Sequence, residues 1–275
     1  MNRAGAMAPD PSKVAFLREL TRRHENLVVW KHLDRALRGR GDIDAAAPAD
    51  DIPSVAANAV SIAANTLGAS HVIHCDHVAD KRLQFFVQPE LLPQLFEFDL
   101  CVQPSRGLAP WASPSAMVAL AAIRPDGIRS LRPGAEAVVS LVYHGLSPSG
   151  RDRLAGEERE IVDSGIATDF AGAEEACATL PPWPARRPLR ELVMMLAERS
   201  WDSNRAQLAF TAFLGSTLAH PVFATRRVLF RATLAGGREC VMSSLARHQA
   251  RRVPPSGLDH LFDAARAGGH KVVAL

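Results

Sequence analysis

The chain has 275 residues, of which 47% are hydrophobic and 22% charged, values typical of a globular protein with a substantial core. Its formal charge of +3 is small for this length and is no strong nucleic-acid footprint. No apolar run of about 18 residues predicts a membrane span, and residues 1–11 contain no apolar stretch typical of a signal peptide. The four cysteines form no CxxC pair, which favours reduced thiols. We therefore expect a cytoplasmic protein without a membrane partner, and a disordered lead-in at residues 1–11.

Helices and strands alternate in the first hundred residues of the predicted structure. Apolar residues recur at helical spacing from Ser12, a plausible N-cap, to Arg23. A second helix spans residues 51–67, with Pro53 in its first turn and Gly68 after its end. A brief helical turn is expected at residues 33–37, and strands at residues 27–30, 42–47, 70–78, 82–87 and 95–102.

Helical periodicity dominates the rest of the chain. It predicts helices at residues 115–122, 133–143, 189–199, 204–218, 240–251 and 258–267. Residues 148–188 are rich in Pro, Gly and charge, and indicate a loop region with one or two short helices. The expected fold is therefore α+β. A domain at residues 12–125, with a small mixed sheet and packed helices, precedes a mostly helical domain at residues 126–275.

Asp42 and Asp44 are the most informative pair in the sequence, because residues i and i+2 of a strand project from the same face. Two adjacent carboxylates repel each other. Water, a basic neighbour or a divalent cation can offset this repulsion, and Mg²⁺ prefers such hard oxygen ligands. The glycines that precede the pair, Gly39 and Gly41, leave the strand end open to a ligand.

Asp99 is a third candidate ligand. It lies in the middle of an otherwise apolar strand, where an acid is costly without a partner or a role. Alternation places Asp99 on the face of Glu97 and Cys101, opposite the face of Phe96 and Phe98. If this strand lies beside the Asp42–Asp44 strand, three carboxylates converge and can hold two cations. An edge strand that faces water is the alternative for Asp99, and a solvated strand end is the alternative for the pair.

Residues 27–103 resemble the nucleotidyltransferase superfamily typified by DNA polymerase beta, whose core carries a DxD pair on one strand and a third acid on a later strand. Asp42 and Asp44 match the pair, and Asp99 matches the third acid. The family's Gly-Ser after the first strand is replaced here by Trp30-Lys31-His32. Some divergent members are similar in carrying a lysine in this turn.

The resemblance implies a Mg²⁺-dependent enzyme that transfers a nucleoside monophosphate from ATP or another NTP to an acceptor. The acceptor is left open as a small molecule, a sugar or another macromolecule. Asp42, Asp44 and Asp99 would be the catalytic and metal-binding residues, with one or two ions. The residues expected near the nucleotide phosphates are Lys31, His32, Arg38, Arg40 and Gly41. The alternative is a degenerate fold of this family that binds a nucleotide or a protein without turnover, which the Trp30-Lys31-His32 turn motivates.

Residues 71–77 are dense in metal-ligand types, with His71, His74, Cys75, Asp76 and His77. Consecutive strand positions give poor tetrahedral geometry for zinc. We interpret them mainly as strand positions, with His74 or Asp76 as candidates for the wall of the active site. No P-loop and no GxSxG motif is present in the sequence, which weighs against a P-loop nucleotide hydrolase and a serine hydrolase.

Overall fold

The structure is a computed structural model of the 275-residue chain. It describes residues 8–219 apart from residues 40, 79–80, 89–93 and 107–108, together with residue 225 and residues 257–267 and 269–275. The fold is α+β with one mixed eight-stranded sheet, which confirms the predicted class. Among the helices of these residues, none is both long and apolar enough to cross a membrane. The helix predicted at residues 240–251 lies outside the described residues.

Two compact units make up the chain. The sheet unit comprises Met1–Cys101, Ile123–Arg129 and Leu229–Leu275, and the helical unit comprises Val102–Ala122 and Ser130–Val228. This division differs from the predicted boundary near residue 125, because the last strand of the chain pairs within the sheet.

The sheet unit follows the predicted order of elements. Its elements are α1 (Pro11–Arg23), β1 (Val28–Lys31), α2 (Leu33–Leu37), β2 (Ile43–Ala46), α3 (Ile52–Thr66), β3 (His71–Val78), β4 (Lys81–Gln88), β5 (Gln94–Cys101), α12 (Gly257–Ala267) and β10 (Lys271–Ala274). All but β10 were predicted, with bounds within one or two residues. The predicted N-cap of α1 is wrong by two residues. Asp10 holds that position, because its carboxylate accepts a hydrogen bond from the Ser12 amide at 2.9 Å.

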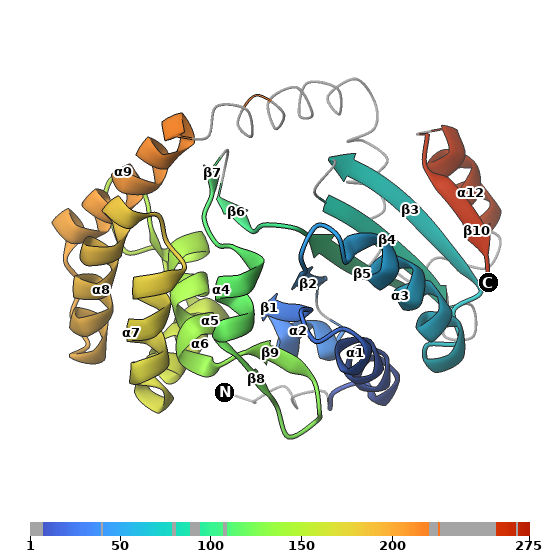
Figure 1. The fold of residues 1–275 in the computed structure, drawn as a ribbon, viewed down its shortest axis with the longest axis horizontal. Coiled ribbons are helices and arrows are strands. Elements are labelled where there is room, and N and C mark those ends of the chain that lie inside the picture. Colours follow the sequence, from blue (N-terminus) through green and yellow to red (C-terminus); the bar gives the residue numbers. More distant parts are fainter. Residues whose placement is uncertain are drawn as a thin grey trace. The chain divides into compact units, whose positions relative to one another are not determined.

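The strands lie in the order β10-β3-β4-β5-β2-β1-β9-β8, where β8 is Ala121–Ile123 and β9 is Arg129–Leu131 (Figure 1). Strand β2 pairs with β5 in parallel, whereas the pairs β1–β2, β3–β4, β4–β5 and β3–β10 are antiparallel. The parallel pair places the DxD strand directly beside the strand of Asp99.

Helices α1 and α3 cover one face of the sheet. The Phe16 ring of α1 makes edge contacts with Phe86, Phe96 and Phe98, at centroid distances of 5.6, 5.4 and 5.8 Å. Helix α12 packs on the alternate positions of the strands, in a buried cluster that includes Leu83 and Leu95. Asp99 is four residues after Leu95 on the same strand and is the register partner of Leu83. Its side chain therefore lies on the same face as these two leucines, opposite α1 and α3.

The helical unit contains a β6–β7 ribbon and a series of packed helices. Its elements are β6 (Ser105–Arg106), β7 (Ala109–Pro110), α4 (Pro114–Ala119), α5 (Pro133–Ser140), the π-helix η1 (Leu141–Gly145), α6 (Gly156–Thr168), α7 (Phe170–Thr179), α8 (Trp183–Ala197) and α9 (Ser203–Ala219). Residues 148–188, predicted as a loop region with one or two short helices, instead contain α6, α7 and the start of α8, so the predicted loop is wrong for most of its length. Pro184, one of its loop signals, lies in the first turn of α8, where no backbone donor is needed.

Asp169 lies between α6 and α7 and connects this junction to α5. Its carboxylate accepts two hydrogen bonds from the Arg132 guanidinium, at 2.6 and 2.9 Å. It also accepts the backbone amides of Gly134 in α5 and Gly172 in α7, at 3.1 and 3.0 Å. Gly134 itself approaches the Asp169 carbonyl so closely that a Cβ there would lie 2.0 Å from that oxygen. The hydrogen bonds of the Asp169 carboxylate thus hold α5 and α7 together.

Candidate metal centre

The turn that leads into β2 depends on its glycines. Gly39 has φ +76° and Gly41 has φ +100°, which favour glycine because a Cβ is strained there. The Arg35 Nε lies 3.7 Å from the position that a Cβ on Gly41 would take. A guanidinium therefore flanks the residue that immediately precedes Asp42. Arg40, predicted to contact phosphate, lies outside the described residues.

Three carboxylates converge at the end of this turn. Asp44 and Asp99 are register partners in the parallel β2–β5 pair, and Asp42 lies two residues before Asp44. One ligand oxygen from each of the three lies within 4.8 Å of the other two. Asp44 and Asp99 are only 4% and 7% exposed, whereas Asp42 is partly exposed. The triad is thus a buried pair of acids whose third member reaches solvent.

Lys31 is the basic neighbour of the triad. It is the register partner of Asp44 across β1–β2, and its Nζ lies 3.1 Å from the Asp44 Oδ2. A register shift between Val29 and Lys31 places Trp30 at an irregularity in the strand, and the Lys31 ammonium lies 5.0 Å from the centroid of the Trp30 ring. The Lys31 ammonium offsets part of the repulsion among the three carboxylates.

Two other predicted nucleotide contacts, His32 and Arg38, differ in burial. His32 adopts a left-handed conformation with φ 55° just before α2, and its side chain is buried. Arg38 is the C-cap residue of α2, and its side chain is partly exposed. Arg35, which flanks Gly41, was not among the predicted phosphate contacts. Its position beside the turn could be expected from the single helical turn between it and the glycines.

The described side chains of the histidine-rich strand β3 do not extend the site. The His71 ring packs on Phe262 of α12, with centroids 4.5 Å apart. His74 lies 3.4 Å from the Gln84 amide nitrogen, which also donates to the Ala56 carbonyl of α3. His74 is therefore on the α3 face, opposite Asp99, so its predicted place in the active-site wall is wrong. The side chains of Asp76 and His77 lie outside the described part.

The triad fits a hard divalent cation. Carboxylate oxygens are the ligands that Mg²⁺ takes, commonly one or two from the protein with the remainder from substrate phosphates and water. Two buried acids on adjacent strands also form a strongly negative site that a cation stabilises. Asp42 is partly exposed, so a cation that it binds can also be bound by a group that arrives from solvent.

The chain matches no protein family model, no curated protein and no solved structure.

Replacing Lys31 by methionine should strengthen metal binding in the absence of nucleotide. The ammonium and a cation compete for the Asp44 carboxylate, so its removal should raise Mn²⁺ affinity by about tenfold. Titration of free Mn²⁺ by electron paramagnetic resonance measures this affinity. Lys271→Met, at an exposed position on β10, controls for overall charge, and an affinity of Lys31→Met equal to or below wild type would contradict the competition.

Proposed function

We propose that the protein is a Mg²⁺-dependent nucleotidyltransferase that transfers a nucleoside monophosphate from an NTP to an acceptor hydroxyl. The observation that carries this proposal is the convergence of Asp42, Asp44 and Asp99, with Asp44 and Asp99 in register on neighbouring parallel strands. The order of elements before them, with a helix, a strand, a short turn and the DxD strand, is similar to that of the nucleotidyltransferase superfamily. A cytoplasmic location, where NTPs and Mg²⁺ are abundant, suits this activity.

Asp42 and Asp44 would hold the metal, with Asp99 beside them. Mg²⁺, when bound, neutralises the phosphate charge that builds up during transfer. Asp99 accepts the proton of the acceptor hydroxyl. The hydroxyl oxygen forms a bond to the α-phosphorus of the NTP, and the bond from that phosphorus to the bridging oxygen of the β-phosphate breaks. Pyrophosphate leaves with the bonding electrons.

Basic side chains near the triad would bind the triphosphate. Lys31 already lies against Asp44, and a cation at the triad would free its ammonium for a phosphate oxygen. The Arg35 guanidinium beside Gly41 is a second phosphate contact at the open end of the turn. These residues take the place of the glycine-serine turn of the family.

A degenerate nucleotide-binding fold without turnover is the second candidate. The Trp30-Lys31-His32 turn favours it, because His32 is bulky, buried and left-handed where the family has a small residue. Release of pyrophosphate from an NTP and Mg²⁺ separates the two candidates, since a binding module releases none.

Both candidates predict nucleotide binding that depends on Mg²⁺. Isothermal titration of the full chain with non-hydrolysable α,β-methylene analogues of ATP, CTP, GTP and UTP tests this binding. We expect one analogue to bind with Mg²⁺ and to bind at least about tenfold more weakly in EDTA, because the metal bridges protein and phosphates. Equal affinity with and without the metal would show that the triad is no nucleotide–metal site.

A further inference from the structure

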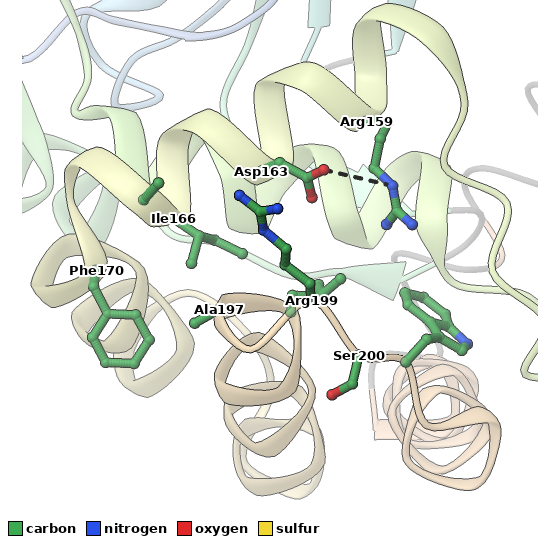
Figure 2. A pocket seen from close by; sticks show the side chains of 10 residues that line it. Arg159, Asp163, Ile166, Phe170, Ala197, Arg199 and Ser200 are labelled. Atoms are coloured by element: carbon green, nitrogen blue, oxygen red, sulfur yellow. Dashed lines mark ion pairs between the residues drawn. The ribbon is translucent and has the colours of Figure 1, made fainter.

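A second candidate site lies within the helical unit. A cavity of about 590 Å³ opens among α6, α7 and the turn that follows α8. Figure 2 shows side chains from all three segments directed around it. The lining includes Arg159, Asp163, Ile166, Phe170, Arg199 and Trp201. Its volume is in the range of pockets that enclose small organic molecules.

Arg199 occupies a position that normally belongs to glycine. Its φ is +57°, and it follows the end of α8, where the Ser200 amide donates to the Met195 carbonyl at 2.8 Å. This pattern favours glycine at the left-handed residue, because a Cβ is strained there. Its side chain extends toward α6 (Figure 2) and makes no ion pair with any residue that the structure describes. Strain at a residue whose charge faces a cavity points to a binding role.

Arg159 brings a second guanidinium to the cavity. It forms ion pairs with Asp152 at 2.9 Å and with Asp163 at 3.7 Å. Its Nη1 is buried and has no hydrogen-bond acceptor among the described residues. Arg159 is already paired with two carboxylates, so among the described residues Arg199 is the lining cation that has no ion pair. Guanidinium groups bind carboxylate and phosphate oxygens in paired hydrogen bonds, and this lining therefore favours a single negative charge.

The remaining wall is apolar and rigid. The Trp201 indole is fixed by a hydrogen bond from its Nε1 to the Gly150 carbonyl at 2.8 Å. Ile166 and Leu196 are buried residues that present apolar atoms to the same cavity. Phe170, 37% exposed, lies at its other side (Figure 2). Fixed aromatic walls stabilise a flat apolar ring by stacking or edge contacts.

We propose that this cavity binds a small organic anion that carries a flat apolar ring. Arg199 and Arg159 hold the anionic group, and Trp201 with Ile166 contacts the ring. This site is separate from the proposed nucleotidyltransferase function and does not depend on it.

Isothermal titration of the full chain with three probes tests whether the cavity prefers an anionic ligand to a neutral one. The probes are 2-naphthoate, 2-naphthyl phosphate and the neutral 2-naphthalenemethanol. We expect at least one anion to bind about tenfold more tightly than the alcohol, because only the anions pair with the guanidiniums. The stronger of the two anions identifies a carboxylate or a phosphate as the natural group. Equal binding of all three probes, or no binding of any, would overturn the proposal.

Arg199→Asn isolates the role of the charge. Asparagine tolerates the left-handed conformation, so thermal unfolding of this variant should occur at or above the wild-type temperature. Affinity for the preferred anion should fall by about tenfold or more, while that for the alcohol stays the same. Arg187→Gln, on the exposed surface of α8, is the matched control and should bind as wild type. Unchanged anion affinity in Arg199→Asn would contradict the assignment.

Discussion

Replacing Asp44 by asparagine should abolish metal-dependent nucleotide binding. The substitution keeps the shape of the side chain but removes a charged ligand that lies in register with Asp99. We expect the affinity for Mn²⁺ and for the Mg²⁺–nucleotide complex to fall by about a hundredfold or more. Isothermal titration measures the nucleotide, and electron paramagnetic resonance measures the bound Mn²⁺.

Asp126→Asn is the matched control for this prediction. Asp126 belongs to the sheet unit but caps a turn, where it accepts the Ile128 amide at 3.2 Å. Its substitution should leave metal and nucleotide affinity at the wild-type level. If Asp44→Asn also binds as wild type, with an unchanged unfolding temperature, the triad is a structural cluster of acids and holds no functional metal.

Asp169→Asn should destabilise the helical unit by about 2 kcal/mol, because the asparagine removes the charge that pairs with the partly exposed Arg132 guanidinium and leaves Glu175, at 3.1 Å, as its anionic partner. The variant also weakens the hydrogen bonds to the amides of α5 and α7. Denaturant unfolding followed by circular dichroism measures the free energy. Asp163→Asn, whose side chain is 55% exposed and whose ion pair with Arg159 spans 3.7 Å, is the control and should change stability by less than about 1 kcal/mol.

The stabilisation by Asp169 should depend on pH. Burial raises the pKa of the Asp169 carboxyl, but hydrogen bonds from Arg132 and two backbone amides outweigh burial and hold the pKa below its usual value. A lowered folded-state pKa means that the stabilisation is complete above the unfolded-state pKa, about 4, and is lost as pH falls through the folded-state pKa. The difference between wild type and Asp169→Asn should therefore narrow in acid. A difference that is constant from neutral pH to pH 2 would show that the charge of Asp169 contributes nothing.

The sheet unit was largely predictable because its local signals agree. Alternation along residues 95–102 placed Asp99 opposite Phe96 and Phe98, and the rings of those two residues indeed pack on Phe16. Proline at the start and glycine at the end defined α3. Strand neighbours could only be assumed, since the parallel pairing of β2 with β5 joins residues more than fifty positions apart.

The helical unit was harder to predict for physical reasons. Helices α6 and α7 have many small or charged residues and bury few large side chains, so their apolar periodicity is weak. In the sheet unit, β10 was missed because its sequence, Lys-Val-Val-Ala, shows no alternation of apolar and polar residues. The cavity could not be expected at all, because its lining comes from three segments and depends on the backbone conformation of Arg199.

Anomalous scattering at the manganese edge would locate a metal ion at the three carboxylates. Crystals of the full chain grown with Mn²⁺ and the preferred α,β-methylene nucleotide should give a manganese peak within coordination distance of the Asp42 and Asp44 carboxylates, beside Asp99, with the triphosphate completing the shell. A bound nucleotide whose phosphates lie away from the three carboxylates, with no manganese between them, would show that the triad is not the nucleotide–metal site.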